Sequence, residues 1–198
     1  MKDFWNIRYN ETEYIYGTKP NEFFASSLAQ LAPGKIILPC EGEGRNAVYA
    51  ASLGWDVYAF DFSESAKNKA MNLAQNKKVQ FEYQVMDIAA AQYPENSVDV
   101  VALIYTHFPI EIRERMHQKI CTWLKPGGKI ILEAFNPAQL ANSSGGPKDP
   151  SMLYSKSMLM NDFKNCNIHL LEECTIHLNE GKYHSGKADV IRLIAEKI

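Results

Sequence analysis

Short apolar runs alternate with helix-forming segments along the first two thirds of the chain. Apolar runs occur at residues 36–38, 56–62 and 98–103, and each is followed by a turn and then by a helical pattern. The run at 98–103 is nearly continuous, which is typical of a central parallel strand covered on both faces. Strands and helices that alternate in this way predict a parallel sheet with right-handed connections. We therefore expect a doubly wound α/β fold.

The two ends of the chain have different patterns. Residues 3–19 carry aromatic side chains, among them Trp5, Tyr9, Tyr14 and Tyr16, between polar ones without a clean period. Residues 170–177 and 188–196 are strand-like, and the stretch 179–186 that joins them contains Asn, Gly and Ser and is too short for a helix. These two runs predict an antiparallel hairpin at the edge of the sheet. NAD-binding folds normally lack such an ending.

The first predicted strand ends in a glycine-containing loop. Gly42, Gly44 and Ala47 fit the spacing G-x-G-x-x-G/A, in which small residues let the backbone turn sharply and approach a ligand closely. Glycines at a strand-to-helix turn also occur for conformational reasons alone. Asp61 follows Gly42 by nineteen positions and ends the second strand, where an acid accepts hydrogen bonds from ribose hydroxyls. The combination favours a nucleotide-like ligand over a helix-cap role for Asp61 beside Ser63.

The residues at these strand ends resemble those of the class I S-adenosylmethionine-dependent methyltransferases. The resemblance covers nearly the whole chain and rests on EGEG at 41–44, Asp61, Asp87, the strand 98–105 and LKPGG at 124–128. The segments WNIRY at 5–9, YGTKPN at 16–21, EGEGRNA at 41–47 and GGPKD at 145–149 are similar to a bacterial branch near the tellurite-resistance and thiopurine methyltransferases. The resemblance implies a seven-stranded, mostly parallel Rossmann-like sheet with an antiparallel C-terminal hairpin. It also implies methyl transfer from S-adenosylmethionine to a small-molecule acceptor.

The resemblance assigns residues to S-adenosylmethionine as the cofactor. Gly42 and Gly44 are expected near its methionyl end, Asp61 at the ribose hydroxyls, and Asp87 with Ile88 at the adenine. The complete set of predicted cofactor-binding residues is Tyr16, Cys40, Glu41, Gly42, Gly44, Asn46, Asp61, Phe62, Ser63, Asp87, Ile88 and Ile104.

Two positions depart from the family pattern acid-x-Gly-x-Gly-x-Gly. Leu38 stands at the acid position and Cys40 at the first glycine. The missing acid removes the usual anchor near the methionine end, and the Cβ atom of Cys40 restricts how closely the cofactor approaches. We expect Glu41, and after it Glu43, to offer a carboxylate near the ammonium or sulfonium; the alternative is that both are exposed to solvent.

The acceptor side is predicted from the fourth strand and from the connection after the fifth. Ligands of open α/β sheets lie beyond the carboxyl ends of strands, so residues 104–109 should line this side. The connection 136–161 contains three prolines and is interpreted as an acceptor-side loop. We expect one domain over residues 1–198, in which residues 1–34 form an N-terminal lid and helix.

Catalysis by such a protein needs few reacting side chains. A methyl group on a sulfonium is already activated, so the main tasks are to align donor and acceptor and to exclude water. An oxygen or nitrogen acceptor that carries a proton also calls for a general base, whereas a thiolate does not. His107 is the first candidate, because histidine titrates near neutrality; a structural histidine is the alternative. Tyr105 is the second candidate and His184 the third. The acceptor atom, whether S, O, N or a metalloid, stays open.

Composition limits which classes of binding partner and which cellular compartment we expect for this chain. A chain of 198 residues with 46% hydrophobic and 22% charged residues is ordinary globular material. A net charge of -2 gives no basic stripe, so we expect no nucleic-acid partner. The four cysteines have no CxxC spacing and accompany no secretory segment, which predicts free thiols in a reducing cytoplasm. No apolar run approaches the roughly 18 residues of a membrane span, so we expect no membrane partner.

Other function classes receive little support from the sequence. The five histidines form no HxxxH or HExxH pair and the cysteines lack a zinc spacing, so we expect no metal. A monomer or homodimer is expected. Two alternatives stay open: an NAD-dependent oxidoreductase, because the first βαβ unit alone does not separate the two cofactors, and a regulatory protein that binds the cofactor without turnover.

Overall fold

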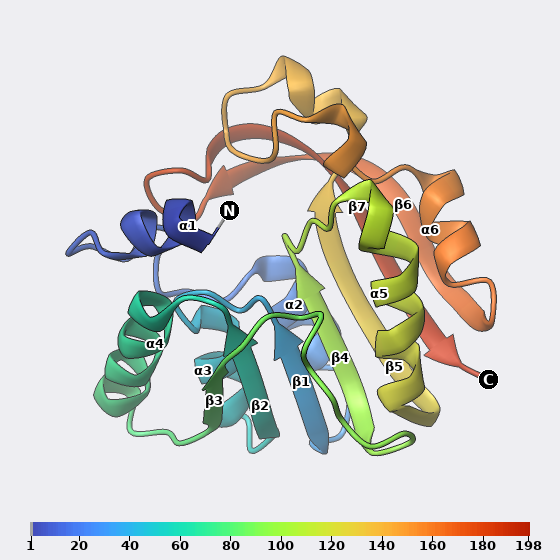
Figure 1. The fold of residues 1–198 in the computed structure, drawn as a ribbon, viewed down its shortest axis with the longest axis horizontal. Helices are drawn as coiled ribbons and strands as arrows, with labels where there is room; N and C mark the ends of the chain where they lie inside the picture. The colour runs from blue at the N-terminus through green and yellow to red at the C-terminus, as the bar shows by residue number, and fades with distance from the viewer. Residues whose placement is uncertain (1) are drawn as a thin grey trace. The chain divides into compact units, whose positions relative to one another are not determined.

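The computed structural model describes residues 2–198, and the chain divides into two compact units (Figure 1). The N-terminal unit runs to Gln92 and also includes Glu180–Tyr183. The C-terminal unit comprises Tyr93–Asn179 and His184–Ile198. Within residues 2–198, no helix is long and apolar enough to cross a membrane.

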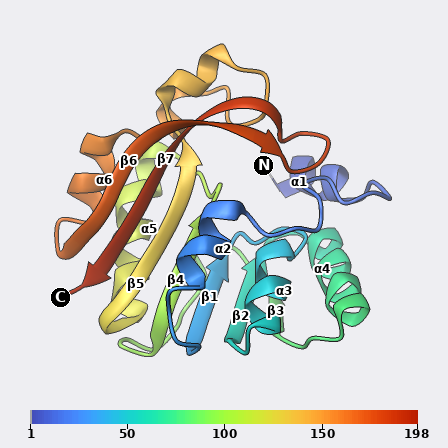
Figure 2. The same cartoon turned by 180° about the vertical axis from the view of Figure 1, so that it is seen from behind.

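The N-terminal unit is built on three parallel strands in the order β3-β2-β1. Its elements are α1 (Lys2–Tyr9), α2 (Glu22–Leu28), β1 (Lys35–Pro39), α3 (Arg45–Ser52), β2 (Asp56–Asp61), α4 (Glu64–Lys77) and β3 (Glu82–Val85). The apolar side chains of β1 are fully buried, and α3 lies against β2 (Figure 2). The side chain of Ser63 caps α4 by accepting a hydrogen bond from Ala66 N at 3.2 Å.

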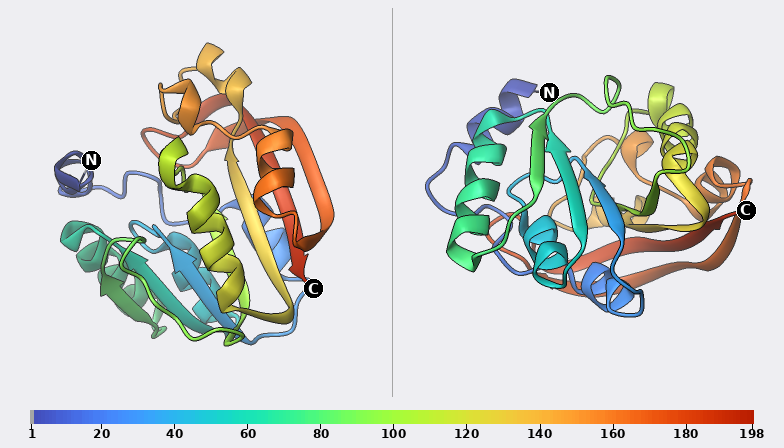
Figure 3. Two further views of the ribbon diagram at one scale, coloured as in Figure 1. Left: turned by 45° about the vertical axis from the view of Figure 1, so that its right-hand side comes forward. Right: turned by 90° about the horizontal axis from the view of Figure 1, so that it is seen from below.

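The C-terminal unit contains four strands in the order β4-β5-β7-β6. Its elements are β4 (Val98–Ile104), α5 (Ile110–Trp123), β5 (Leu124–Phe135), η1 (Pro137–Ala141), η2 (Pro150–Met152), α6 (Lys156–Asp162), β6 (Cys166–Asn179) and β7 (Ser185–Lys197). β4 and β5 are parallel, whereas β7 pairs antiparallel with both β5 and β6. Helices α5 and α6 lie next to each other beside β5 and β6 (Figure 3).

The predicted fold class is confirmed. Residues 2–198 contain seven strands, with parallel pairs in both units and the antiparallel pairs at the C-terminal end. The hairpin strands are longer than predicted, because β6 begins at Cys166 and β7 ends at Lys197. Two helices were missed: α1, and α6 inside the connection that the sequence analysis treated as a loop.

Candidate functional site

The loop after β1 has a left-handed backbone conformation. The φ angles are 54° at Cys40, 59° at Gly42 and 83° at Gly44. A Cβ atom at Gly42 would lie 2.7 Å from the hydroxyl of Tyr9, and one at Gly44 would lie 2.5 Å from the Cβ of Ala70. Both glycines are therefore required by conformation and by packing. Cys40 adopts the same conformation with a side chain, a strained arrangement that clusters at functional sites.

Glu41 caps the helix that follows the loop. Its Oε1 accepts hydrogen bonds from Asn46 N at 2.9 Å and Ala47 N at 2.7 Å, and its Oε2 accepts one from Asn46 Nδ2 at 3.4 Å. Burial raises the pKa of Glu41 to about 7, although these hydrogen bonds oppose the shift. The side chain thus satisfies backbone donors in the first turn of α3.

Glu43 is buried, which excludes the alternative that its side chain faces solvent. Its carboxylate forms an ion pair with Lys69 Nζ at 2.8 Å and accepts a hydrogen bond from Tyr16 N at 3.2 Å. These contacts attach the segment around Tyr16 and helix α4 to the glycine loop. The carboxylates of Glu41 and Glu43 are therefore both used to hold the loop and its neighbours.

Asp61 lies at the end of β2, directly beside the glycine loop. Its Oδ2 accepts from Gly42 N at 3.2 Å and its Oδ1 from Ser63 N at 3.0 Å. Burial raises the pKa of Asp61 to about 6. The backbone of Phe62 donates to the same carboxylate. A carboxylate has about four acceptor positions, so one remains for a ligand. Tyr83 holds the other side of the loop, because its hydroxyl donates to Gly42 O at 2.6 Å.

Asp87 and Ile88 follow β3, the next strand of this unit. Asp87 is exposed and its Oδ1 accepts from Ala89 N at 2.8 Å, whereas Ile88 is buried. The negative charges of Asp61 and Asp87 both influence the thiol of Cys40. Its pKa is raised well above the usual value, first by burial and then by these two carboxylates. Both predicted acids therefore act electrostatically on the same loop residue, Cys40.

Helix α1 packs over these residues, which the sequence analysis did not foresee. The ring of Tyr9 stacks on Trp5 at 5.4 Å and meets Tyr16 edge-on at 6.4 Å. Asn6 Oδ1 accepts a hydrogen bond from Ser63 Oγ at 2.6 Å. The pKa of Tyr9 is raised well above its usual value, first by burial and then by the negative charge of Asp61. The aromatic WNIRY segment was the available signal, but its lack of a clean period concealed the helix.

The C-terminal unit holds the predicted acceptor-side residues. Tyr105 follows β4 with a φ of 53°, so the chain has the same left-handed conformation there as at Cys40. Its hydroxyl donates to Glu133 Oε1 at 2.8 Å, and its ring stacks on Phe135 at 4.8 Å. The ring of His184 meets Tyr105 edge-on at 4.6 Å. Tyr105 and the third candidate base are therefore in contact.

Both ring nitrogens of His107 bind backbone groups. Nδ1 lies 2.7 Å from Met152 O, and Nε2 lies 3.2 Å from Phe135 N. Because a carbonyl only accepts and an amide N–H only donates, Nδ1 carries the proton and the ring is neutral. Burial lowers the pKa of His107 to about 4. His107 thus positions the connection after β5; a general-base role would require one of these bonds to open and stays a prediction.

The predicted site residues are divided between the two units. The N-terminal unit brings together Tyr16, Cys40, Glu41, Gly42, Gly44, Asn46, Asp61, Phe62, Ser63, Asp87 and Ile88. Ile104, Tyr105 and His107 belong to the C-terminal unit. Among residues 2–198, no group of three or more His, Cys, Asp or Glu side chains is arranged to hold a metal ion.

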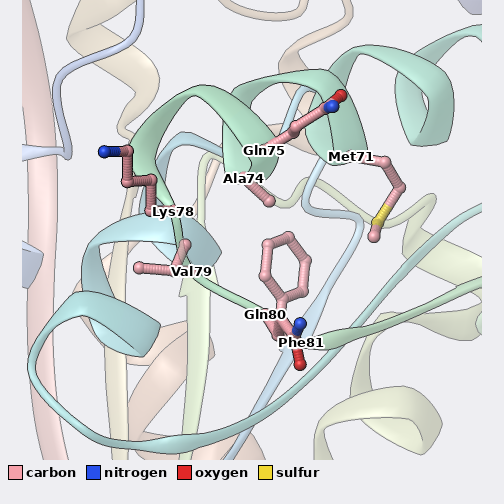
Figure 4. A pocket seen from close by; sticks show the side chains of 7 residues that line it. All are labelled: Met71, Ala74, Gln75, Lys78, Val79, Gln80 and Phe81. Atoms are coloured by element: carbon pink, nitrogen blue, oxygen red, sulfur yellow. The ribbon is translucent and has the colours of Figure 1, made fainter.

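A separate hollow of about 650 Å³ lies at the end of α4 (Figure 4). It is lined by Met71, Ala74, Gln75, Lys78, Val79, Gln80 and Phe81. None of the predicted site residues lines this hollow.

Comparisons with known sequences place the glycine loop inside a conserved domain type. A family model described as "Methyltransferase domain" matches residues 38–128. Phosphoethanolamine N-methyltransferase of Triticum aestivum is 25% identical over 164 residues, which are 82% of this chain and 30% of that protein. Phosphoethanolamine N-methyltransferase 3 of Arabidopsis thaliana is 29% identical over 110 residues, 54% of this chain and 22% of that protein. The chain spans less than a third of the length of these curated relatives.

Solved structures share the fold over most or all of the chain. TehB from Haemophilus influenzae has a TM-score of 0.73 at 18% identity, covering 100% of this chain and 67% of that one. A SAM-dependent methyltransferase from Methanosarcina mazei has a TM-score of 0.73 at 16% identity, covering 91% of this chain and 99% of that one. The TM-scores establish a common fold, and at these low identities they show the fold alone.

Proposed function

We propose that the chain is a class I S-adenosylmethionine-dependent methyltransferase and that it transfers the methyl group of this cofactor to a small-molecule acceptor. The observation that carries the proposal is the buried carboxylate of Asp61 bonded to the Gly42 loop, in the unit that contains most of the methyltransferase-domain match. An acidic ribose site beside a backbone loop is what an adenosyl group requires.

The residues of the N-terminal unit fit the adenosyl part of the cofactor. Asp61 keeps one acceptor position for a ribose hydroxyl, and buried Ile88 offers an apolar surface for the adenine beside the exposed carboxylate of Asp87. Gly42 presents its backbone without a side chain. The cofactor supplies an activated methyl group when bound, and the rings of Trp5 and Tyr9 exclude water near the glycine loop.

Glu41 argues against the NAD-dependent alternative. Dinucleotide-binding folds place the pyrophosphate at the N-terminus of the helix after the glycine loop. In this chain the amides of Asn46 and Ala47 already donate to the Glu41 carboxylate. A pyrophosphate at this position would meet a carboxylate instead of free N–H groups, whereas S-adenosylmethionine carries no phosphate.

On the acceptor side we propose that Tyr105 handles the proton of an oxygen or nitrogen acceptor. Its hydroxyl oxygen would take the acceptor's proton while its own proton passes to Glu133 Oε1, the hydrogen-bond partner at 2.8 Å. Arg192 Nε, 2.7 Å from Glu133 Oε2, holds that carboxylate in place. The curated relatives are named phosphoethanolamine N-methyltransferases, which makes amines the first acceptors to test.

The remaining expectations concern the setting in which the protein works. We propose a single-domain, cytoplasmic monomer or homodimer that acts on small molecules and not on nucleic acid. Size-exclusion chromatography with light scattering tests the oligomeric state.

Calorimetry with S-adenosylhomocysteine tests the cofactor site. We expect Asp61→Ala to weaken binding at least tenfold, because the ribose hydroxyls lose their acceptor. The matched control is Asp56→Ala, an exposed aspartate at the other end of the same strand, which should bind as the wild type does. Equal affinities for wild type and Asp61→Ala would remove Asp61 from the site.

A further inference from the structure

Two cysteines of the C-terminal unit lie in sulfur contact although 45 positions separate them. Cys121 stands near the end of α5 and Cys166 is the first residue of β6, and their Sγ atoms are 3.9 Å apart. Both thiols are free and partly exposed. A disulfide has an S–S distance of about 2.05 Å, so the two sulfurs must come closer by about 1.9 Å to form one.

The fold itself holds the two thiols close. Lys197 lies opposite Cys166 in the β6–β7 ladder, and its Nζ donates to Leu124 O at 2.8 Å and to Thr122 O at 3.3 Å. This lysine therefore ties the strand beside Cys166 to the end of the helix that carries Cys121. Cys166 N in turn donates to Phe163 O at 2.9 Å, which fixes the start of β6. The approach of the sulfurs is a consequence of three separate backbone anchors.

The pair also has an asymmetric proton arrangement. The hydrogen bond from the Cys121 thiol lowers the pKa of Cys166 to about 7, and Lys197 acts in the same direction. The pKa of Cys121 is raised, first by the same hydrogen bond and then by burial. Cys166 is therefore the more acidic thiol of the pair. A thiolate is the nucleophile in thiol–disulfide exchange.

We propose that Cys121 and Cys166 form a reversible intramolecular disulfide when the protein meets a low-molecular-weight disulfide. The Cys166 thiolate attacks one sulfur of the oxidant, forms a mixed disulfide and releases one thiol. The Cys121 sulfur then attacks the Cys166 sulfur, forms the Cys121–Cys166 bond and releases the second thiol. The two cysteines lose two electrons and two protons, and the oxidant is reduced to two thiols. The bond links α5 to β6.

Alkylation mapping of the full chain tests this proposal. The reduced protein is equilibrated with oxidised glutathione, denatured, treated with iodoacetamide and analysed by mass spectrometry. Of the four cysteines, we expect two to escape alkylation together, with a Cys121–Cys166 cross-linked peptide. The oxidised protein should melt roughly 5–10 °C above the reduced one, because the bond restricts the unfolded chain.

Three variants sharpen the test. Cys121→Ser should stop the reaction at a glutathione adduct on Cys166, and Cys166→Ser should prevent the cross-link. Cys174→Ser is the matched control, since this cysteine lies further along β6 beside Arg192 and Glu172, and should cross-link as the wild type does. The proposal is overturned if wild type stays fully alkylated, accumulates a stable glutathione adduct, or cross-links through another cysteine or between chains. The wild-type map decides the question even if a variant fails to fold.

Discussion

Among single residues, Asp61 has a buried carboxylate whose charge is needed for the proposed contact with the ribose. Its pKa is raised to about 6 by burial, so the carboxylate becomes protonated as the pH falls through that value. A protonated carboxyl loses acceptor capacity toward ribose hydroxyls. We expect the affinity for S-adenosylhomocysteine to fall below about pH 6, roughly tenfold per pH unit, as measured by calorimetry between pH 5 and 8.

Two variants separate Asp61 from the second titrating acid of the loop. Asp61→Asn should bind weakly with little pH dependence below pH 6. Glu41, whose pKa is raised to about 7, titrates in a neighbouring range, so Glu41→Gln should retain the decrease below pH 6. A pH dependence that disappears in Glu41→Gln and persists in Asp61→Asn would assign the effect to the helix cap.

Gly42 supports a stability prediction at the same scale. Its φ of 59° strains any L-residue, and a Cβ atom there would lie 2.7 Å from the Tyr9 hydroxyl. We expect Gly42→Ala to lower the free energy of unfolding by about 2–4 kcal/mol. Gly54→Ala is the matched control, because Gly54 has a φ of 87° and open space around it, and should cost about 1 kcal/mol. Urea denaturation measures the free energy of unfolding of both variants. Equal losses would show that the side chain of Tyr9 moves aside without destabilising the protein.

At the scale of elements, His107 connects the segment after β4 to η2 and β5. Its ring is neutral in the folded protein, with a pKa lowered to about 4 by burial, whereas an unfolded histidine titrates near 6.5. Below pH 6.5 the unfolded chain therefore binds more protons, and stability falls with pH until the folded value is reached. We expect this contribution to reach at most about 3 kcal/mol.

The comparison of wild type with His107→Gln isolates that contribution. Their difference in free energy of unfolding should shrink between pH 6.5 and 4, because only wild type carries the titrating ring. His117 and Asp162 also have lowered pKa values but are present in both proteins, so they cancel. Exposed His177→Gln shows the effect of replacing any histidine. A difference that stays constant with pH would mean that the ring of His107 is already charged or exposed.

Sequence patterns predicted the strands better than the short helices α1 and α6. Continuous apolar runs such as 98–103 fixed β4, because a strand covered on both faces admits few polar residues. α1 escaped because it buries aromatic residues against the loop without a helical repeat, and α6 escaped because it has only seven residues. Short helices depend on tertiary packing, which a local pattern does not encode.

At the scale of the whole molecule, motif spacing predicted that Asp61 lies beside the glycine loop but not which groups hold the loop in place. The distance of nineteen positions between Gly42 and Asp61 was sufficient, since parallel strands align their ends. The partners of Glu41 and Glu43 were not predictable. A carboxylate that bonds backbone N–H groups or a distant lysine leaves no trace in spacing, so the sequence could not separate helix cap, ion pair and ligand contact.

Ligand-linked stability tests the assignment for the protein as a whole. A ligand that binds only the folded state at about 100 times its dissociation constant stabilises by about 2.7 kcal/mol. For a chain of this length the melting temperature should rise by roughly 5–10 °C with S-adenosylhomocysteine. NAD at equal concentration should leave it unchanged, because the Glu41 carboxylate already occupies the helix amides. The shift should be strongly reduced in Asp61→Ala and preserved in Asp56→Ala. A larger shift with NAD would contradict the methyltransferase assignment and favour an oxidoreductase.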